Sequence, residues 1–250
     1  MQIGSVNGGQ TLAEAQVQKN IQKLFVTLSG SKTSGASATT KFLTDAGNVF
    51  LTVKRIGRSI GEKSIIPRLS LAQLIGLSAG IKGFAYSNGS DAATSYGGAF
   101  TFDLSLLGNI RLESGDYISV TCENNATGTT CALAAVAGAT TTGDHCKVSK
   151  ITLQPSEQKR VNVNFADYVA IPQTVIEARF VNTTDSFTLN GLALGGLALD
   201  NMTPIFSMSG GGIQIPELVV IPAHEVEYVD LTNGSSVADV LIVRQKDYSN

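Results

Sequence analysis

The chain has 250 residues, with 18 basic and 20 acidic side chains, so its formal net charge is −2. This balance gives no electrostatic reason to expect nucleic acid or an anionic membrane as the main partner. Only 15% of the residues are charged, against about 25% in an ordinary soluble domain, and the chain has 26 Gly, two His and no Trp. These counts favour a low-charge β protein, and we expect neither enzymatic activity nor a cofactor.

The N-terminal segment carries a helix signal. Thr11 to Glu14 fits a capping box, and the apolar Ala15, Val17 and Ile21 follow at near-helical spacing. The pattern predicts one amphipathic helix over residues 11–22, within an N-terminal arm formed by residues 1–23. Because its apolar stripe is narrow, we expect the helix to dock on its own domain, on a neighbouring subunit or on lipid.

From Leu24 onward the apolar residues recur with a period of two, which is typical of half-buried strands. The pattern predicts strands around residues 24–28, 49–53, 100–106 and 118–122, and a short helix over 70–79 between the second and third of them. Residues 126–147 contain small residues without a steady period, so we expect a crossover loop there. Alternation then resumes at Ile151 and continues to the apolar run Val240 to Val243.

Helices that join successive strands in strict alternation are absent, so a parallel sheet is disfavoured. The sequence therefore predicts an all-β protein of two antiparallel β-sandwiches, over residues 24–125 and 148–250, with a short N-terminal helix and one inserted helix. The two halves share their strand density but no repeat at the level of residue identity.

The cysteines are the first candidates for chemistry. Cys122, Cys131, His145 and Cys146 are residue types that bind zinc, but their spacing lacks the paired ligands of structural zinc sites. A disulfide between Cys131 and Cys146, or between Cys122 and Cys146, is one alternative, and unpaired thiols are the other. The odd number of cysteines favours a reducing site of folding.

Two further groups of residues are candidates for function. His224 and Glu225 could form an acid–base pair, but if Glu225 begins a strand the two side chains point to opposite faces, which favours a turn histidine. A basic cluster could contact phosphate, yet it lacks interleaved aromatic residues, and a salt-bridged edge explains it better. Its members are Lys54, Arg55, Arg58, Lys63 and Arg68. We assign no catalytic, cofactor-binding or metal-binding residue.

The chain begins without a basic stretch followed by an apolar run, so no secretory signal is visible, and no apolar stretch approaches the ~20 residues that span a bilayer. We expect no membrane-spanning segment.

The order of these elements resembles the double jelly-roll major capsid proteins of tailless, membrane-containing icosahedral bacterial viruses. The resemblance implies two upright jelly rolls, homotrimers with a pseudo-hexagonal outline, contacts with neighbouring trimers and minor capsid proteins, and an N-terminal arm near an internal membrane. It also implies synthesis in the host cytoplasm, a final location in the virion, and no specific binding of nucleic acid. The alternative is a receptor-binding spike or an adhesin-like β-domain.

Overall fold

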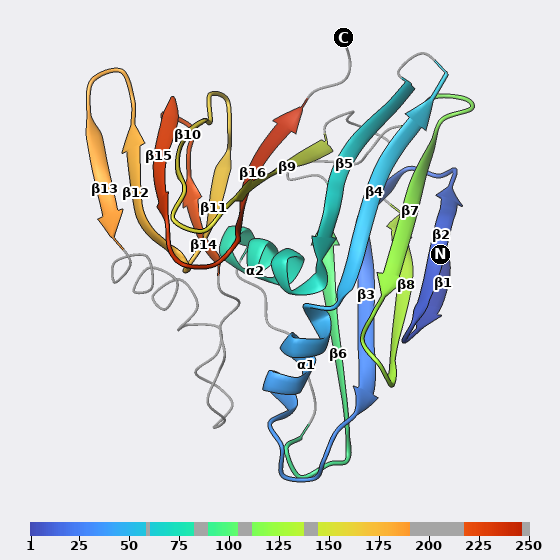
Figure 1. Cartoon of the computed structure of the whole chain (residues 1–250). Coiled ribbons are helices and arrows are strands. Elements are labelled where there is room, and N and C mark those ends of the chain that lie inside the picture. The colour runs from blue at the N-terminus through green and yellow to red at the C-terminus, as the bar shows by residue number, and fades with distance from the viewer. Residues whose placement is uncertain (59–60, 83–89, 105–111, 138–144, 191–217, 247–250) are drawn as a thin grey trace.

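The computed structural model describes residues 1–58, 61–82, 90–104, 112–137, 145–190 and 218–246. In these residues the chain forms sixteen strands and two helices (Figure 1). The first eight strands make two four-stranded antiparallel sheets, ordered β1-β8-β3-β6 and β2-β7-β4-β5. They are β1 (Gln2–Asn7), β2 (Gln10–Val17), β3 (Ile21–Ser31), β4 (Val49–Gly57), β5 (Gly61–Ser70), β6 (Ser95–Asp103), β7 (Tyr117–Asn124) and β8 (Thr129–Ala137).

The last eight strands repeat this arrangement. Their two antiparallel sheets are ordered β9-β16-β11-β14 and β10-β15-β12-β13, so adding eight to each strand number of the first half reproduces the second half. They are β9 (His145–Leu153), β10 (Gln158–Asn162), β11 (Tyr168–Pro172), β12 (Val175–Val181), β13 (Ser186–Asn190), β14 (Leu218–Pro222), β15 (Tyr228–Asn233) and β16 (Ala238–Lys246).

Eight antiparallel strands in two facing sheets, paired in this crossed order, form a jelly roll. We call β1–β8 the first jelly roll and β9–β16 the second. They lie side by side, and their long strands run in roughly the same direction (Figure 1). The predicted all-β double jelly roll is therefore confirmed.

The predicted N-terminal helix is wrong. Residues 11–17 belong to β2, and β3 begins at Ile21 after a three-residue connection. Strand β2 pairs with β7 in a register that places Leu12 opposite Cys122 and Val17 opposite Ile118. That register shifts between Leu12 and Ala15, where Glu14 has a φ of 51°. Such a bulge adds residues to one strand, so the apolar positions lose their period of two and imitate helical spacing. The segment predicted as an arm therefore contains two strands of the first jelly roll.

The crossover loop predicted over residues 126–147 is also wrong in extent, because it contains β8 and the start of β9. Four residues of β8 point into the core at every second position, namely Thr129, Cys131, Leu133 and Ala135. Three of these are small or polar, so the alternation is present but gives little contrast in hydrophobicity. The first jelly roll consequently extends from Gln2 to Ala137.

The predicted inserted helix is confirmed as α2 (Leu71–Lys82). A capping box precedes it, since Ser70 Oγ accepts from the Gln73 backbone N–H and Gln73 Oε1 accepts from the Ser70 backbone N–H. A second helix, α1 (Ala38–Ala46), was missed. Its buried Ala38, Phe42 and Ala46 recur every four residues, but threonines dilute the pattern.

Helix α2 joins the two jelly rolls. It lies between them in Figure 1, and its Leu71, Leu74 and Ile75 are fully buried in a core that also contains outward-facing residues of the β9-β16-β11-β14 sheet. Those residues are Val148, Ala170, Leu218, Val220, Leu241 and Val243. The other face of the same sheet fills the core of the second jelly roll. This sheet is therefore buried on both faces, which explains the uninterrupted apolar run Val240 to Val243.

The contact is close at its centre. A Cβ at Gly80 of α2 would lie 2.3 Å from Cγ2 of Val220, so the helix can approach β14 this closely only because residue 80 has no side chain.

Candidate functional site

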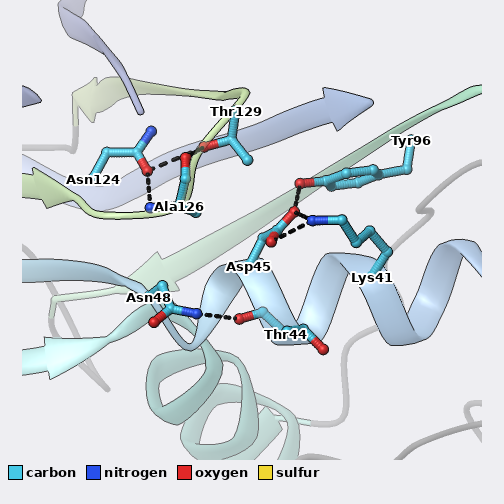
Figure 2. Close-up of polar contacts among 8 residues, drawn as sticks. All are labelled: Lys41, Thr44, Asp45, Asn48, Tyr96, Asn124, Ala126 and Thr129. Atoms are coloured by element: carbon cyan, nitrogen blue, oxygen red, sulfur yellow. Dashed lines mark hydrogen bonds and ion pairs between the residues drawn. The ribbon is translucent and has the colours of Figure 1, made fainter. Parts of the chain in front are cut away.

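A buried carboxylate anchors α1 to the first jelly roll (Figure 2). Lys41 Nζ lies 2.6 Å from both carboxylate oxygens of Asp45, and the Tyr96 hydroxyl donates a hydrogen bond to Asp45 Oδ2. Burial, together with the hydrogen bond to Asp45 and its charge, raises the pKa of Tyr96, so Tyr96 remains a protonated donor. Both oxygens of Asp45 are occupied by these partners, so the cluster holds structure together and offers no free base.

An asparagine closes the same turn in each jelly roll. Asn124, the last residue of β7, donates from Nδ2 to the carbonyl of Val6 at 3.0 Å. Its Oδ1 accepts from Ala126 N and Thr129 Oγ1 at 3.1 Å each (Figure 2). Asn124, Ala126 and Thr129 are all buried. The side chain therefore ties the turn after β7 to the end of β1.

Asn233, the last residue of β15, does the same in the second jelly roll. Its Nδ2 donates to the carbonyls of Gln154 and Ser236 at 2.8 and 2.7 Å, beside the end of β9. Strands β7 and β15 occupy equivalent places, and they begin with Tyr-Ile-Ser-Val-Thr and Tyr-Val-Asp-Leu-Thr respectively. The repeat thus extends to side chains, although it becomes visible only after the strands have been aligned.

The basic cluster is largely neutralised by ion pairs. Arg55 and Asp116 form a buried pair with Nη2 2.8 Å from Oδ2, and Lys54 pairs with Glu62 at 2.8 Å. The third pair joins Arg68 of β5 to Glu123 of β7 at 2.8 Å, and its hydrogen bond lowers the pKa of Glu123. Arg58 and Lys63 are exposed. Three of the five cations thus form ion pairs that connect β4 or β5 to other parts of the same sheet, as expected for a salt-bridged edge.

Neither of the disulfides with Cys146 that the sequence left open is formed. Cys122 and Cys131 are buried free thiols whose Sγ atoms lie 3.9 Å apart. Cys146 lies on β9, opposite Gln245 in the second jelly roll, and the side chains of His145 and Cys146 lie outside the described residues. In the described part of the chain, no group of three or more His, Cys, Asp or Glu could hold a metal ion.

His224 and Glu225 occupy an exposed turn between β14 and β15. His224 Nδ1 lies 3.7 Å from Oδ1 of Asp167, and its ring meets the edge of Tyr168 at 6.1 Å. Strand β15 begins at Tyr228 rather than at Glu225, so the strand start assumed in the sequence is corrected by three residues. The geometry therefore supports the interpretation of His224 as a turn histidine.

A carboxylate links the two jelly rolls at their junction. Asp239 of β16 accepts from Gln73 Nε2 of α2 at 3.1 Å and from Thr152 Oγ1 at 2.7 Å, and Lys150 Nζ lies 3.5 Å away. Burial alone would raise the pKa of Asp239, but these hydrogen bonds and the charge of Lys150 lower it below its ordinary value of 3.8. The ionised carboxylate therefore stabilises the junction.

The most unusual surface is the outer face of the β1-β8-β3-β6 sheet, which we call the neutral face. Among the described residues of this face, the only charged ones are Lys23 and Asp103, which pair with each other at 3.5 Å. Phe25 and Val136 are 38% and 41% exposed on it. The strand registers and burial pattern assign to it Gln2, Ser5, Asn7, Lys23, Phe25, Thr27, Ser29, Ser95, Gly97, Ala99, Thr101, Asp103, Thr130, Ala132, Ala134 and Val136.

The equivalent face of the second jelly roll is the one that α2 and β5 cover. In the first jelly roll no described segment packs on the same face, although the face has few charges and an exposed aromatic residue, as the centres of protein interfaces do. Its residues come from four strands that are far apart in the chain, so no local sequence pattern indicates this face. We take the neutral face as the candidate functional site, a surface for association.

No protein-family model and no curated protein matches the chain. Among solved structures, it is similar to the crystal structure of the mavirus major capsid protein, with 9% sequence identity and a TM-score of 0.29. The match covers 98% of this chain and 84% of that one. At this level of likeness, the fold assignment rests on the strand order described above. No helix among the described residues is long and apolar enough to cross a membrane.

Proposed function

We propose that this chain is a major capsid protein that forms the shell of an icosahedral virus. The observation that carries the proposal is the repeated strand order, which gives one chain two jelly rolls side by side, joined by a buried helix. This is the architecture of the double jelly-roll capsid proteins that the order of elements in the sequence resembles. A location in the virion, after synthesis in the host cytoplasm, is part of the same proposal.

The internal junction supports association into homotrimers. Within the chain, the edge strand β5 lies against β9, and α2 lies against β14, so one side of the first jelly roll covers the outer face of the second. Because the topology repeats, the edge strand equivalent to β5 is β13, and the strand equivalent to β9 is β1. We propose that β13 of one copy lies beside β1 of the next, over the neutral face. Each such contact joins two different surfaces of the chain, so it is heterologous. Three copies related by this contact form a closed ring of six jelly rolls with a pseudo-hexagonal outline.

The composition of both surfaces suits this contact. On β13, Phe187 is 48% exposed and stacks on Phe180 with ring centroids 4.6 Å apart, so the aromatic side chain is already held in place. On the neutral face, Phe25 stands among small uncharged residues. Preorganised aromatic side chains and the absence of unpaired charges both reduce the cost of association.

Two other outer surfaces carry charges that are paired within the chain. Arg68 pairs with Glu123 and its guanidinium lies 3.8 Å from the ring centre of Phe50, while Arg160 pairs with Asp230 and lies 3.9 Å from that of Tyr228. Faces of this kind could meet neighbouring trimers or minor capsid proteins without leaving a charge unpaired. Residues 2–7 and 10–17 form strands of the first jelly roll, so they do not form a separate arm that could contact an internal membrane.

The test is the mass and shape of the purified protein. We expect native mass measurement to give a trimer, and electron microscopy to show pseudo-hexagonal outlines or closed particles. A strictly monomeric protein at high concentration, with no particles and with measurable affinity for glycans, would refute the proposal and favour the adhesin-like alternative.

A further inference from the structure

Two thiols meet between the sheets of the first jelly roll. Cys122 lies on β7 opposite Leu51, and Cys131 lies on β8 opposite Leu28, so each belongs to a different sheet of the sandwich. Both side chains are fully buried, and their Sγ atoms are 3.9 Å apart, which is contact distance. The two strands are consecutive in the chain and are joined by the turn at residues 125–128.

We propose that Cys122 and Cys131 form an oxidation site that closes into a disulfide between the two sheets of the first jelly roll. A disulfide bond measures about 2.05 Å, so the sulfur atoms need to approach by about 2 Å. Two S–H bonds break and one S–S bond forms. The two electrons and two protons pass to a low-molecular-weight disulfide, which is reduced to two thiols. The inference is independent of the capsid proposal.

The same surroundings keep the pair reduced while the jelly roll is closed. The hydrogen bond with Cys122 and burial raise the pKa of Cys131, and disulfide exchange requires a thiolate. With both residues fully buried, the oxidant also has no direct path to them. Oxidation therefore needs a transient opening of the sandwich. A reducing compartment leaves two thiols, whereas an oxidising one traps the disulfide and ties the sheets together.

The experiment uses the whole chain with Cys146→Ala, which leaves only the two cysteines of interest. The protein is incubated with oxidised glutathione in mild denaturant, the denaturant is removed, and the product is digested by a protease that cleaves after glutamate. Cleavage after Glu123 separates Cys122 from Cys131, so the two peptides stay joined only through a disulfide. We expect the joined peptides, the loss of two hydrogen masses, and an unfolding midpoint about 5–10 °C above that of the reduced protein.

The matched controls are Cys122→Ala and Cys131→Ala in the same background, whose unfolding midpoints should not change with the oxidant. Disulfide-linked dimers, glutathione mixed disulfides that never close, or an oxidised protein no more stable than the reduced one would overturn the proposal. If Cys146→Ala does not fold, the natural sequence serves, because a further cleavage after Asp144 separates Cys146 from Cys131 and identifies the pairing.

Discussion

Replacing Phe25 by alanine should weaken the trimer, while the chain still folds. Phe25 is the largest apolar side chain of the neutral face, and 38% of it remains exposed in the single chain. Since an aromatic side chain presents about 200 Å², about 75 Å² of Phe25 is left for a partner to cover. At about 25 cal/mol per Å², this area contributes about 2 kcal/mol to each contact.

A loss of about 2 kcal/mol weakens each contact about 30-fold. A closed trimer contains three equivalent contacts, so its overall association constant should fall by about 10⁴. The rest of the side chain, about 125 Å², is already covered in the single chain, so the folded monomer should also lose about 3 kcal/mol at the same coefficient. Sedimentation velocity over a concentration series measures the association, and thermal unfolding of the monomer measures the fold.

The structure offers matched variants. Phe187→Ala removes the aromatic side chain on the opposing surface and should weaken the trimer similarly, while Phe50→Ala removes a phenylalanine from the outer face of the other sheet of the first jelly roll and should leave the trimer intact. If Phe25→Ala assembles as the natural protein does, or if Phe50→Ala weakens the trimer as much, the neutral face is not the contact surface.

Three further predictions concern the fold that presents this face. Asn124→Ala and Asn233→Ala should each lower the free energy of unfolding by about 1–3 kcal/mol, because each leaves buried backbone groups without a partner; urea titrations measure this, and a much smaller effect at either site would contradict the shared role. The pKa of Asp239 lies below its ordinary value of 3.8, so its contribution to stability is present above pH 3.8 and is lost as the pH falls through its pKa in the folded protein. Asp239→Asn should remove this part of the loss of stability in acid. If the free energy of unfolding falls with decreasing pH in the variant as it does in the natural protein, the prediction is refuted. Gly80→Ala should cost about 1–3 kcal/mol, because the added methyl collides with Val220. The double variant with Val220→Ala should recover part of this loss in thermal unfolding, and purely additive losses would exclude the collision.

The sequence by itself determined the class of fold. Strands β3, β4 and β6 alternate because a pleated strand sends successive side chains to opposite faces, and this constraint is local enough to read without a structure. The same locality explains the errors. At β2 a bulge interrupts the two-residue period of the apolar positions, so the sequence pattern predicts a helix there. In β8 small residues weaken the difference in hydrophobicity between alternate positions, so the pattern predicts a loop.

Tertiary structure decided everything that depends on which strands lie side by side. The run Val240 to Val243 is apolar throughout because α2 covers the outer face of its sheet. The residues around Phe25 alternate because only one face of their sheet is covered by described residues. Cys122 meets Cys131 because their strands lie in facing sheets. Strand pairing joins residues up to about 130 positions apart, as Gln2 and Ala134 are. Local periodicity records whether a face is buried, but the identity of the covering surface is set by contacts between distant segments.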